Sequence, residues 1–181
     1  MNNLVLVVDM IKGFVNEGAL CDPDNKKLIP NIISLLNHYK DNIFINDAHS
    51  DNSKEFKWFP KHCLKNSVEG EIVEELKPLA KEIVYKNSTN GFFSLNKAIL
   101  NKYDNIVITG VCSDICILQV ALTLNAYFNE INSPTNVIVV EDAINTYTLD
   151  GHDANEYNDI ALKLMRNSNI KIVNTRDLIN E

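Results

Sequence analysis

The sequence predicts an α/β fold, a three-layer αβα sandwich in which helices cover both faces of a central, six-stranded, mostly parallel sheet. Two observations support this prediction. Short runs rich in valine and isoleucine recur six times along the 181 residues, and they are continuous rather than alternating, as expected of strands buried on both faces. Stretches with helical spacing separate most of these runs, and such alternation is typical of parallel strands joined by crossover helices.

The individual elements follow from these patterns in chain order. We expect strands at residues 4–9, 42–49, 82–86, 105–110, 136–142 and 170–175, and helices within residues 27–40, 69–82, 94–103, 114–128 and 155–167. The length suits one substantial core, so residues 1–181 are expected to form a single domain. One long loop, residues 50–67, interrupts the alternation, and a long loop inside a compact domain is usually functional.

Composition and charge indicate which class of ligand the protein can bind. With 17 basic and 24 acidic residues the net charge is -7, so the chain has no overall field that attracts nucleic acid or an anionic membrane, and a small molecule fits better. The first apolar run lacks a basic flank and meets Asp9 after five residues, so we expect neither a signal peptide nor an anchor, and a cytoplasmic location. In that reducing compartment the four cysteines are expected to be core residues, ligands or nucleophiles rather than disulfides.

Chemically useful groups follow four of the six predicted strands. These are Asp9, the Asp47 and His49 pair, Lys86, and Gly110, which leads into "VCSDIC". Ligands of open parallel sheets gather beyond the carboxyl ends of the strands. The sequence therefore predicts a functional site at this edge of the sheet.

The stretch "TGVCSDIC", residues 109–116, contains two cysteines. No second closely spaced pair accompanies them, which disfavours a structural zinc site, and three intervening residues disfavour a redox pair. Cys116 is expected in the first turn of a helix, where the thiolate is favoured, with Ser113 or Asp114 as the cap. Asp9 could then act as its base and Lys86 could stabilise a thiolate, although a buried structural cysteine remains the alternative.

A second cluster lies in "DAHSDNSKEFKWFPKH", residues 47–62. It contains two histidines and several carboxylates: Asp47, His49, Asp51, Glu55 and His62. Such a set suits a zinc, iron or manganese ion that keeps open positions, and a solvated loop is the alternative interpretation. The other two histidines, His38 and His152, are expected at the surface.

These motifs, in this order, resemble the nicotinamidases of the isochorismatase-like cysteine hydrolase superfamily. The matching residues are Asp9 with Phe14, Asp47 with His49, "FPKHC" at 59–63, Lys86, and "GVCSDIC" at 110–116. The resemblance implies the isochorismatase-like, Rossmann-like fold, with Cys116 as nucleophile, Asp9 as base and Lys86 as the third catalytic residue. It also implies a cis peptide at Val111-Cys112 and an oxyanion hole made by the backbone N–H groups of Cys112 and Cys116.

The resemblance further implies one divalent metal ion, zinc before iron or manganese. Its ligands would be Asp47, His49 and His62, with Glu55 as the fourth and Asp51 as the rival. The implied reaction is hydrolysis of nicotinamide to nicotinate and ammonia through a cysteine thioester, in NAD salvage, and the implied assembly is a homo-oligomer. Aromatic candidates to hold a flat ring are Phe14, Trp58, Phe59, Phe92 and Phe93, each of which could instead belong to the core.

Two departures from the family pattern bear on the substrate. Many relatives have Gln and Asp where this chain has Ile11 and Gly13, and "NSTNGFF", residues 87–93, replaces a Ser-Ala-Phe-like run. Two alternatives to a nicotinamidase stay open. One is a cysteine hydrolase for another small amide or carbamoyl compound, and the other is a non-catalytic relative whose Cys116 is unreactive.

Overall fold

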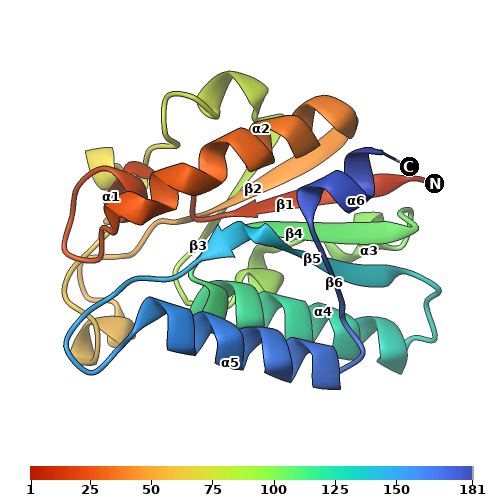
Figure 1. Cartoon of the computed structure of the whole chain (residues 1–181). Coiled ribbons are helices and arrows are strands. Elements are labelled where there is room, and N and C mark those ends of the chain that lie inside the picture. The colour runs from red at the N-terminus through yellow and green to blue at the C-terminus, as the bar shows by residue number, and fades with distance from the viewer. Residues whose placement is uncertain (181) are drawn as a thin grey trace.

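The computed structural model describes residues 1–180 and contains the predicted six-stranded sheet (Figure 1). The strands are β1 (Asn3–Val8), β2 (Asp41–Asp47), β3 (Glu82–Lys86), β4 (Asn105–Val111), β5 (Asn136–Asn145) and β6 (Lys171–Val173). Their order across the sheet is β3-β2-β1-β4-β5-β6, and every neighbouring pair is parallel. The predicted fold class is confirmed, and the sheet is parallel throughout.

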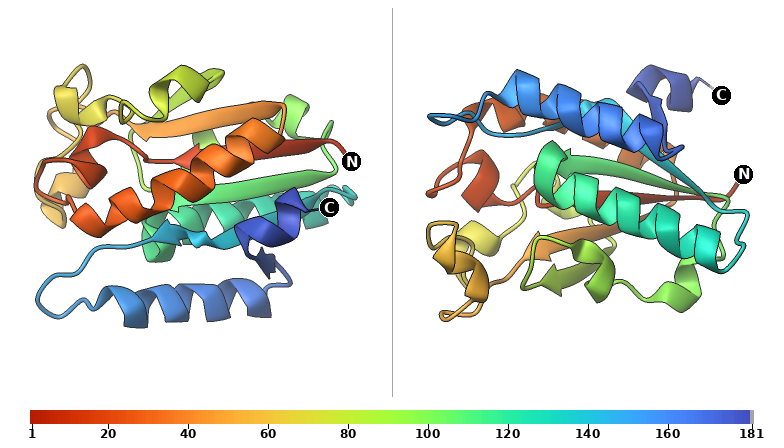
Figure 2. Two further views of the ribbon diagram at one scale, coloured as in Figure 1. Left: turned by 45° about the horizontal axis from the view of Figure 1, so that its top comes forward. Right: turned by 90° about the horizontal axis from the view of Figure 1, so that it is seen from below.

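Helices cover both faces of the sheet (Figures 1 and 2). One face carries α1 (Lys12–Val15), α2 (Ile29–His38) and α6 (Thr175–Ile179), and the other carries α3 (Lys97–Leu100), α4 (Leu118–Glu130) and α5 (Ala154–Asn167). Alternate residues of the strands feed the two cores, as in Val5 and Val7 on the first face against Leu4 and Leu6 on the second. Burial of both faces accounts for the continuous apolar runs in the sequence.

The prediction of a helix within residues 69–82 is wrong. Only two short 3-10 turns form there, η3 (Val68–Gly70) and η4 (Lys77–Leu79). The backbone between them is bonded to the segment after β1 instead, with Lys12 N–H donating to Glu71 O at 2.8 Å and Val73 N–H donating to Met10 O at 3.2 Å. Pro78 also lacks the N–H that the interior of a helix over these residues would need. Tertiary hydrogen bonds thus replace the expected helix.

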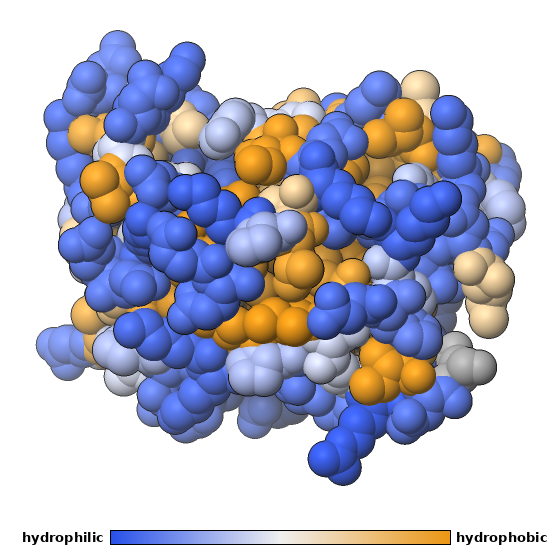
Figure 3. Space-filling view, turned by 90° about the horizontal axis from the view of Figure 1, so that it is seen from above, coloured by the Kyte–Doolittle hydropathy of each residue, from blue (hydrophilic) through white to orange (hydrophobic). Residues whose placement is uncertain are grey.

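The missing helix leaves part of β3 uncovered. Ile83 is 42% exposed and Tyr85 is 61% exposed, although both lie in the middle of a strand. Figure 3 shows the molecule from above, where apolar surface gathers in a band bordered by polar residues. The helix predicted at 94–103 is also shorter than expected and consists of the four residues of α3.

The register of the strands brings the predicted site residues together. Val8 at the end of β1 is level with Ile45 of β2 and Gly110 of β4, and Asp47 is level with Lys86. Gly110 has a φ of +111°, and a Cβ there would lie 2.0 Å from Val8 O, so this position requires glycine. The carboxyl ends of the strands therefore meet at one edge, away from the two termini (Figure 1).

Within residues 1–180, none of the helices has the length and the apolar character needed to cross a bilayer.

Candidate active site

Three predicted catalytic side chains meet at the carboxyl ends of the central strands. Asp9 follows β1, Lys86 ends β3, and Cys116 lies in a π-helical turn, η6 (Ser113–Ile117), that leads into α4. Lys86 Nζ forms an ion pair with Asp9 Oδ2 at 2.8 Å and lies 3.7 Å from Cys116 Sγ. All three side chains are buried. The sheet therefore assembles an acid, a cation and a thiol that are far apart in the sequence.

Burial and the neighbouring charges together set the pKa values in this cluster. Burial raises the pKa of Asp9 to about 6, the nearby Asp47 charge adds to the rise, and Lys86 opposes it. Burial also raises the pKa of the Cys116 thiol well above its usual range, although Lys86 acts in the opposite direction. Burial alone would lower the pKa of Lys86, but Asp47 and Asp9 hold it well above normal. Lys86 is thus a permanent cation, and Cys116 needs a base to become a thiolate.

The turn that carries Cys116 has the predicted position but not the predicted cap. The peptide bond Val111-Cys112 is cis, as expected. The N-cap residue of η6 is Cys112, and no side chain caps the turn. Ser113 Oγ is buried without a hydrogen-bond partner among the described residues. Asp114 faces His152 instead.

The predicted metal ligands lie beside this cluster. Asp47 ends β2, and its Oδ1 accepts a hydrogen bond from Lys86. Its Oδ2 lies 3.4 Å from His49 Nε2 and 3.8 Å from His62 Nε2. One ligand atom from each of the three residues falls within 4.8 Å of the others. Asp47 therefore belongs to both clusters and joins them.

Two features of the histidines fit a divalent ion. His62 Nδ1 lies 2.8 Å from Pro60 O, so this nitrogen donates and leaves the lone pair of Nε2 facing the cluster. His49 Nε2 is buried and has no hydrogen-bond partner within the described chain. An imidazole nitrogen of this kind is the usual ligand for zinc and similar metals. The donors present thus suit the implied metal.

The two candidates for a fourth metal ligand, Glu55 and Asp51, both make other contacts. Glu55 Oε1 accepts a hydrogen bond from Thr89 N–H at 2.8 Å, which ties the loop to the segment after β3. Its rival Asp51 is 87% exposed in its side chain and pairs with Lys61 at 3.5 Å. Both carboxylates have other partners, and the role of Glu55 as a ligand stays a prediction.

The predicted aromatic residues separate into two groups. The rings of Phe14 and Phe59 lie 5.7 Å and 6.3 Å from the ring of His62. Trp58 is 73% exposed and Phe93 is 71% exposed, while Phe92 packs against Tyr127 of α4 with ring centroids 5.4 Å apart. The surroundings of the metal ligands thus include Phe14 and Phe59, and the other three lie at the surface or against α4.

Sequence reasoning missed Phe56. Its ring packs edge-on against both candidate ligands, 5.4 Å from His49 and 5.7 Å from His62 between centroids. Its position inside the loop, next to Glu55, was the available signal. His152, expected at the surface, was also misjudged, since only 14% of its side chain is exposed.

The departure at Gly13 has a physical reason. A Cβ at this position would lie 2.5 Å from Cys63 Sγ and 3.0 Å from Glu69 Cβ. Glu69 Oε2 accepts the backbone N–H of Cys63 at 2.7 Å. Glu69 and Cys63 therefore occupy the space into which any side chain at residue 13 would extend.

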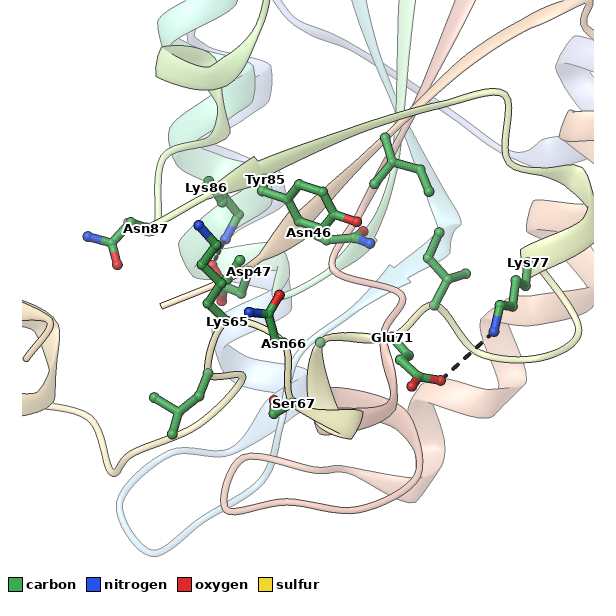
Figure 4. Close-up of a pocket in the computed structure, with 15 residues that line it drawn as sticks. Asn46, Asp47, Lys65, Asn66, Ser67, Glu71, Lys77, Tyr85, Lys86 and Asn87 are labelled. Carbon is green, nitrogen blue, oxygen red and sulfur yellow. Dashed lines mark hydrogen bonds and ion pairs between the residues drawn. The ribbon is translucent and has the colours of Figure 1, made fainter. Parts of the chain in front are cut away.

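An open groove of about 590 Å³ runs along the uncovered side of β3 (Figure 4). Its lining includes Asp47 and Lys86 and continues outward over Asn46, Tyr85 and Lys65. The groove thus adjoins the Asp47–Lys86 pair from the outer side of the sheet.

Comparisons with known proteins agree with this geometry. Residues 3–177 match the family model of the isochorismatase domain. The uncharacterized isochorismatase family protein YaaI of Bacillus subtilis is 26% identical over 98% of this chain and 96% of its own length. Nicotinamidase 1 of Arabidopsis thaliana is 26% identical, and that match covers 75% of this chain and 66% of the plant protein.

Solved structures share the whole fold. An isochorismatase-like hydrolase from Alkaliphilus metalliredigens superposes with a TM-score of 0.81 at 24% identity, over 99% of this chain and 98% of that one. A pyrazinamidase of Pyrococcus horikoshii in complex with zinc gives 0.77 at 26% identity, over 96% and 99%. N-carbamoylsarcosine amidase from Thermoplasma acidophilum gives 0.75 at 22%, over 97% of each chain. The chain is a member of the isochorismatase-like hydrolase family.

Proposed function

We propose that this protein is a metal-dependent nicotinamidase, which hydrolyses nicotinamide to nicotinate and ammonia through a thioester on Cys116. One observation carries the proposal: the Asp9–Lys86–Cys116 cluster shares Asp47 with a buried group of metal-ligand side chains. The first cluster suits attack on an amide, and the second suits a substrate whose ring nitrogen can coordinate a metal. We place the reaction in NAD salvage in the cytoplasm.

In the first half of the reaction, Asp9 takes the proton of the Cys116 thiol and the sulfur attacks the amide carbon. The raised pKa of Asp9, about 6, leaves it ionised near neutral pH yet basic enough to accept a proton. Lys86, 3.7 Å from the sulfur, stabilises the thiolate that forms. The backbone N–H groups of Cys112 and Cys116 would hold the oxyanion.

In the second half, the protonated Asp9 gives its proton to the leaving nitrogen, and the tetrahedral adduct collapses to the thioester as its C–N bond breaks and ammonia departs. Asp9, again a carboxylate, then takes a proton from water as its oxygen attacks the thioester carbon. The C–S bond then breaks, Asp9 returns the proton to the Cys116 sulfur, and the products are the carboxylic acid and the free thiol. The chemistry that a divalent ion would supply when held by Asp47, His49 and His62 is Lewis acidity toward a ring nitrogen or a water molecule.

A carbamoyl amidase is the second candidate. The segment at 87–93 departs from the pattern of nicotinamidases, and the structure ties it to α4 through Thr89 Oγ1 and Gln119 at 3.0 Å and through Asn90 and Thr123 at 2.9 Å. The fold of an N-carbamoylsarcosine amidase is shared as well. The same triad would cleave the C–N bond of such a compound.

Release of ammonia by the purified, metal-loaded protein tests the proposal. We expect turnover of nicotinamide, loss of that turnover in Cys116→Ala, and native turnover in Cys21→Ala, which removes a half-exposed thiol. Pyrazinamide and N-carbamoylsarcosine complete the panel. Ammonia from N-carbamoylsarcosine but not from nicotinamide would favour the carbamoyl amidase. No turnover of any amide, with Cys116 inert to iodoacetamide, would identify a non-catalytic relative.

A further inference from the structure

The segment that follows Lys86 runs along α4, the helix that begins just after Cys116. This connecting segment, residues 87–93, contacts α4 at three points in chain order: Thr89 meets Gln119, Asn90 meets Thr123, and Phe92 meets Tyr127. The first two contacts are hydrogen bonds of 3.0 Å and 2.9 Å, and the third joins rings whose centroids are 5.4 Å apart. The three partners on α4 are spaced four residues apart, so they share one face of the helix.

The connecting segment is also bonded to the long loop beside the candidate metal ligands. Thr89 N–H donates to Glu55 Oε1 at 2.8 Å, and Asn87 Oδ1 accepts the backbone N–H of Ser50 at 2.9 Å. Glu55 is followed by Phe56, whose ring packs against both candidate histidine ligands. The bond from Thr89 to Glu55 therefore holds the part of the loop that contacts these histidines.

The two sets of contacts meet at Thr89, which is half-buried. Its backbone N–H bonds to the long loop, and its hydroxyl bonds to Gln119 of α4. Gln119 lies three residues after Cys116, and Thr89 lies three residues after Lys86. Two hydrogen bonds through one residue thus join the loop beside the metal ligands to the helix that follows the nucleophile.

We propose that Thr89 is a positioning residue that fixes the long loop relative to α4, and thereby sets which length of amide the site accepts. The inference rests on the proposed function. A pyridine carboxamide would meet the metal-binding residues with its ring nitrogen and Cys116 with its amide carbon, so the separation of the two groups selects the spacing between these atoms. That spacing increases from the 2- to the 3- to the 4-carboxamide. Misplacement of reacting atoms by about 1 Å costs on the order of 100-fold in rate.

Thr89→Val tests the proposal, because it keeps the shape of the side chain and the N–H bonded to Glu55 and removes the hydroxyl bonded to Gln119. The measured quantity is kcat/KM of the zinc-loaded protein for picolinamide, nicotinamide and isonicotinamide. We expect the native protein to prefer nicotinamide, and this preference over each isomer to fall roughly tenfold in Thr89→Val. Thr89→Ser should return it to within about twofold of the native value. A merely structural role would lower all three values alike, and an unchanged preference in Thr89→Val would overturn the proposal.

Gln119→Leu removes the same hydrogen bond from the α4 side. It should reproduce the lost preference of Thr89→Val, and Thr89→Val/Gln119→Leu should be as selective as either single variant, because both changes remove one interaction. Losses that multiply in the double variant would mean that the two residues act separately, against the proposal. Thr135→Val is the matched control. Thr135 directly precedes β5, at the opposite edge of the sheet, and its hydroxyl bonds to Tyr103 O at 2.9 Å, so this variant also loses one bond but should keep the native preference.

Zinc titration separates the position of the loop from retention of the ion. The three candidate ligands are unchanged in Thr89→Val, so we expect its zinc affinity to stay within about twofold of the native value. An affinity that falls as far as the preference for nicotinamide would show that Thr89 acts by retaining the ion, and the proposal would then be wrong.

Hydrogen exchange measures the attachment of the loop without any substrate. Backbone amides of residues 50–57 and 87–90 should exchange about two- to tenfold faster in Thr89→Val than in Thr135→Val, the range expected for the loss of one hydrogen bond. Equal exchange in the two variants would overturn the proposal. If the native protein hydrolyses none of the three isomers, the proposed function fails, and the exchange comparison still decides whether Thr89 holds the long loop on α4.

Discussion

The two halves of the site are held in place by different kinds of structure. Asp9, Lys86 and Cys116 follow or end elements of the parallel sheet, and the pairing of β1 with β2 and β4, and of β2 with β3, fixes how they face one another. His62 comes from the long loop and His49 immediately precedes it, and a backbone bridge between His49 and Leu64 and the bond from His62 to Pro60 hold them. Comparing the halves shows that the chemistry is built on rigid strands and the metal ligands on a folded loop.

Asp47 contacts residues of both halves and links them. Its backbone N–H donates to Asp9 Oδ1 at 2.9 Å, its Oδ1 accepts from Lys86, and its Oδ2 faces both histidines. Burial alone would raise its pKa, but the charge of Lys86, together with the nearby His49 and His62 side chains, more than offsets this and holds the pKa well below its usual range. Changes in the strand half should therefore damage stability and activity together, whereas changes in the loop half should mainly affect metal binding.

The largest effect is expected for Lys86→Met. This change leaves the buried carboxylates of Asp9 and Asp47 without their cation, so the free energy of unfolding should fall by about 3 to 5 kcal/mol and amidase activity roughly a thousandfold. Urea denaturation and ammonia release measure the two effects. Asp9→Asn/Lys86→Met should recover part of the stability and none of the activity. Lys77→Met, at a surface ion pair, is the control, and a native unfolding midpoint in Lys86→Met would contradict the dependence on a buried cation.

A smaller and more selective effect is expected for His62→Ala. Loss of one of three candidate ligands should weaken zinc binding at least about 100-fold, because outer-shell changes alone cost 10- to 100-fold. Zinc should raise the thermal midpoint of the native protein by mass action and leave that of His62→Ala unchanged. His38→Ala, at an exposed position, should behave as the native protein does. Equal zinc stabilisation of the native protein and His62→Ala would show that the ion binds elsewhere.

The strand half was more predictable from the sequence than the loop half, for a physical reason. A buried parallel strand leaves a continuous apolar run, so the residue that follows it, such as Asp9 after β1, can be placed at the sheet edge without coordinates. The predicted helix at 69–82 does not form because the backbone of residues 71 and 73 is hydrogen-bonded to residues 12 and 10 instead. Contacts between loops, such as Phe56 with His62 or Asp114 with His152, leave no periodic signal and needed the structure.

Gly13→Ala tests the contact between the two halves. Residue 13 lies in α1, just after the strand end that carries Asp9, and its missing Cβ faces Cys63 of the loop at 2.5 Å. Filling this space should lower the free energy of unfolding by about 1 to 3 kcal/mol. Truncation of the opposing thiol in Gly13→Ala/Cys63→Ala should make the double variant less unstable than the sum of the two changes. Additive losses would mean that residues 13 and 63 are not in contact.

The smallest effect is expected for Phe56→Leu, which touches only the loop half. The Phe56 ring packs against both histidine rings, so its loss should loosen their orientation and weaken zinc binding about tenfold, as removal of other outer-shell contacts does. The free energy of unfolding of metal-free Phe56→Leu should fall by less than that of Lys86→Met. The Phe56 ring is only partly buried, and no buried charge loses its partner. Trp58→Ala, in the same loop with 73% of its surface exposed, is the control and should leave zinc affinity unchanged. Zinc titrations of the three proteins measure these affinities. A native affinity in Phe56→Leu would mean that the loop backbone alone orients His49 and His62, and the loop half would then be as rigid as the strand half.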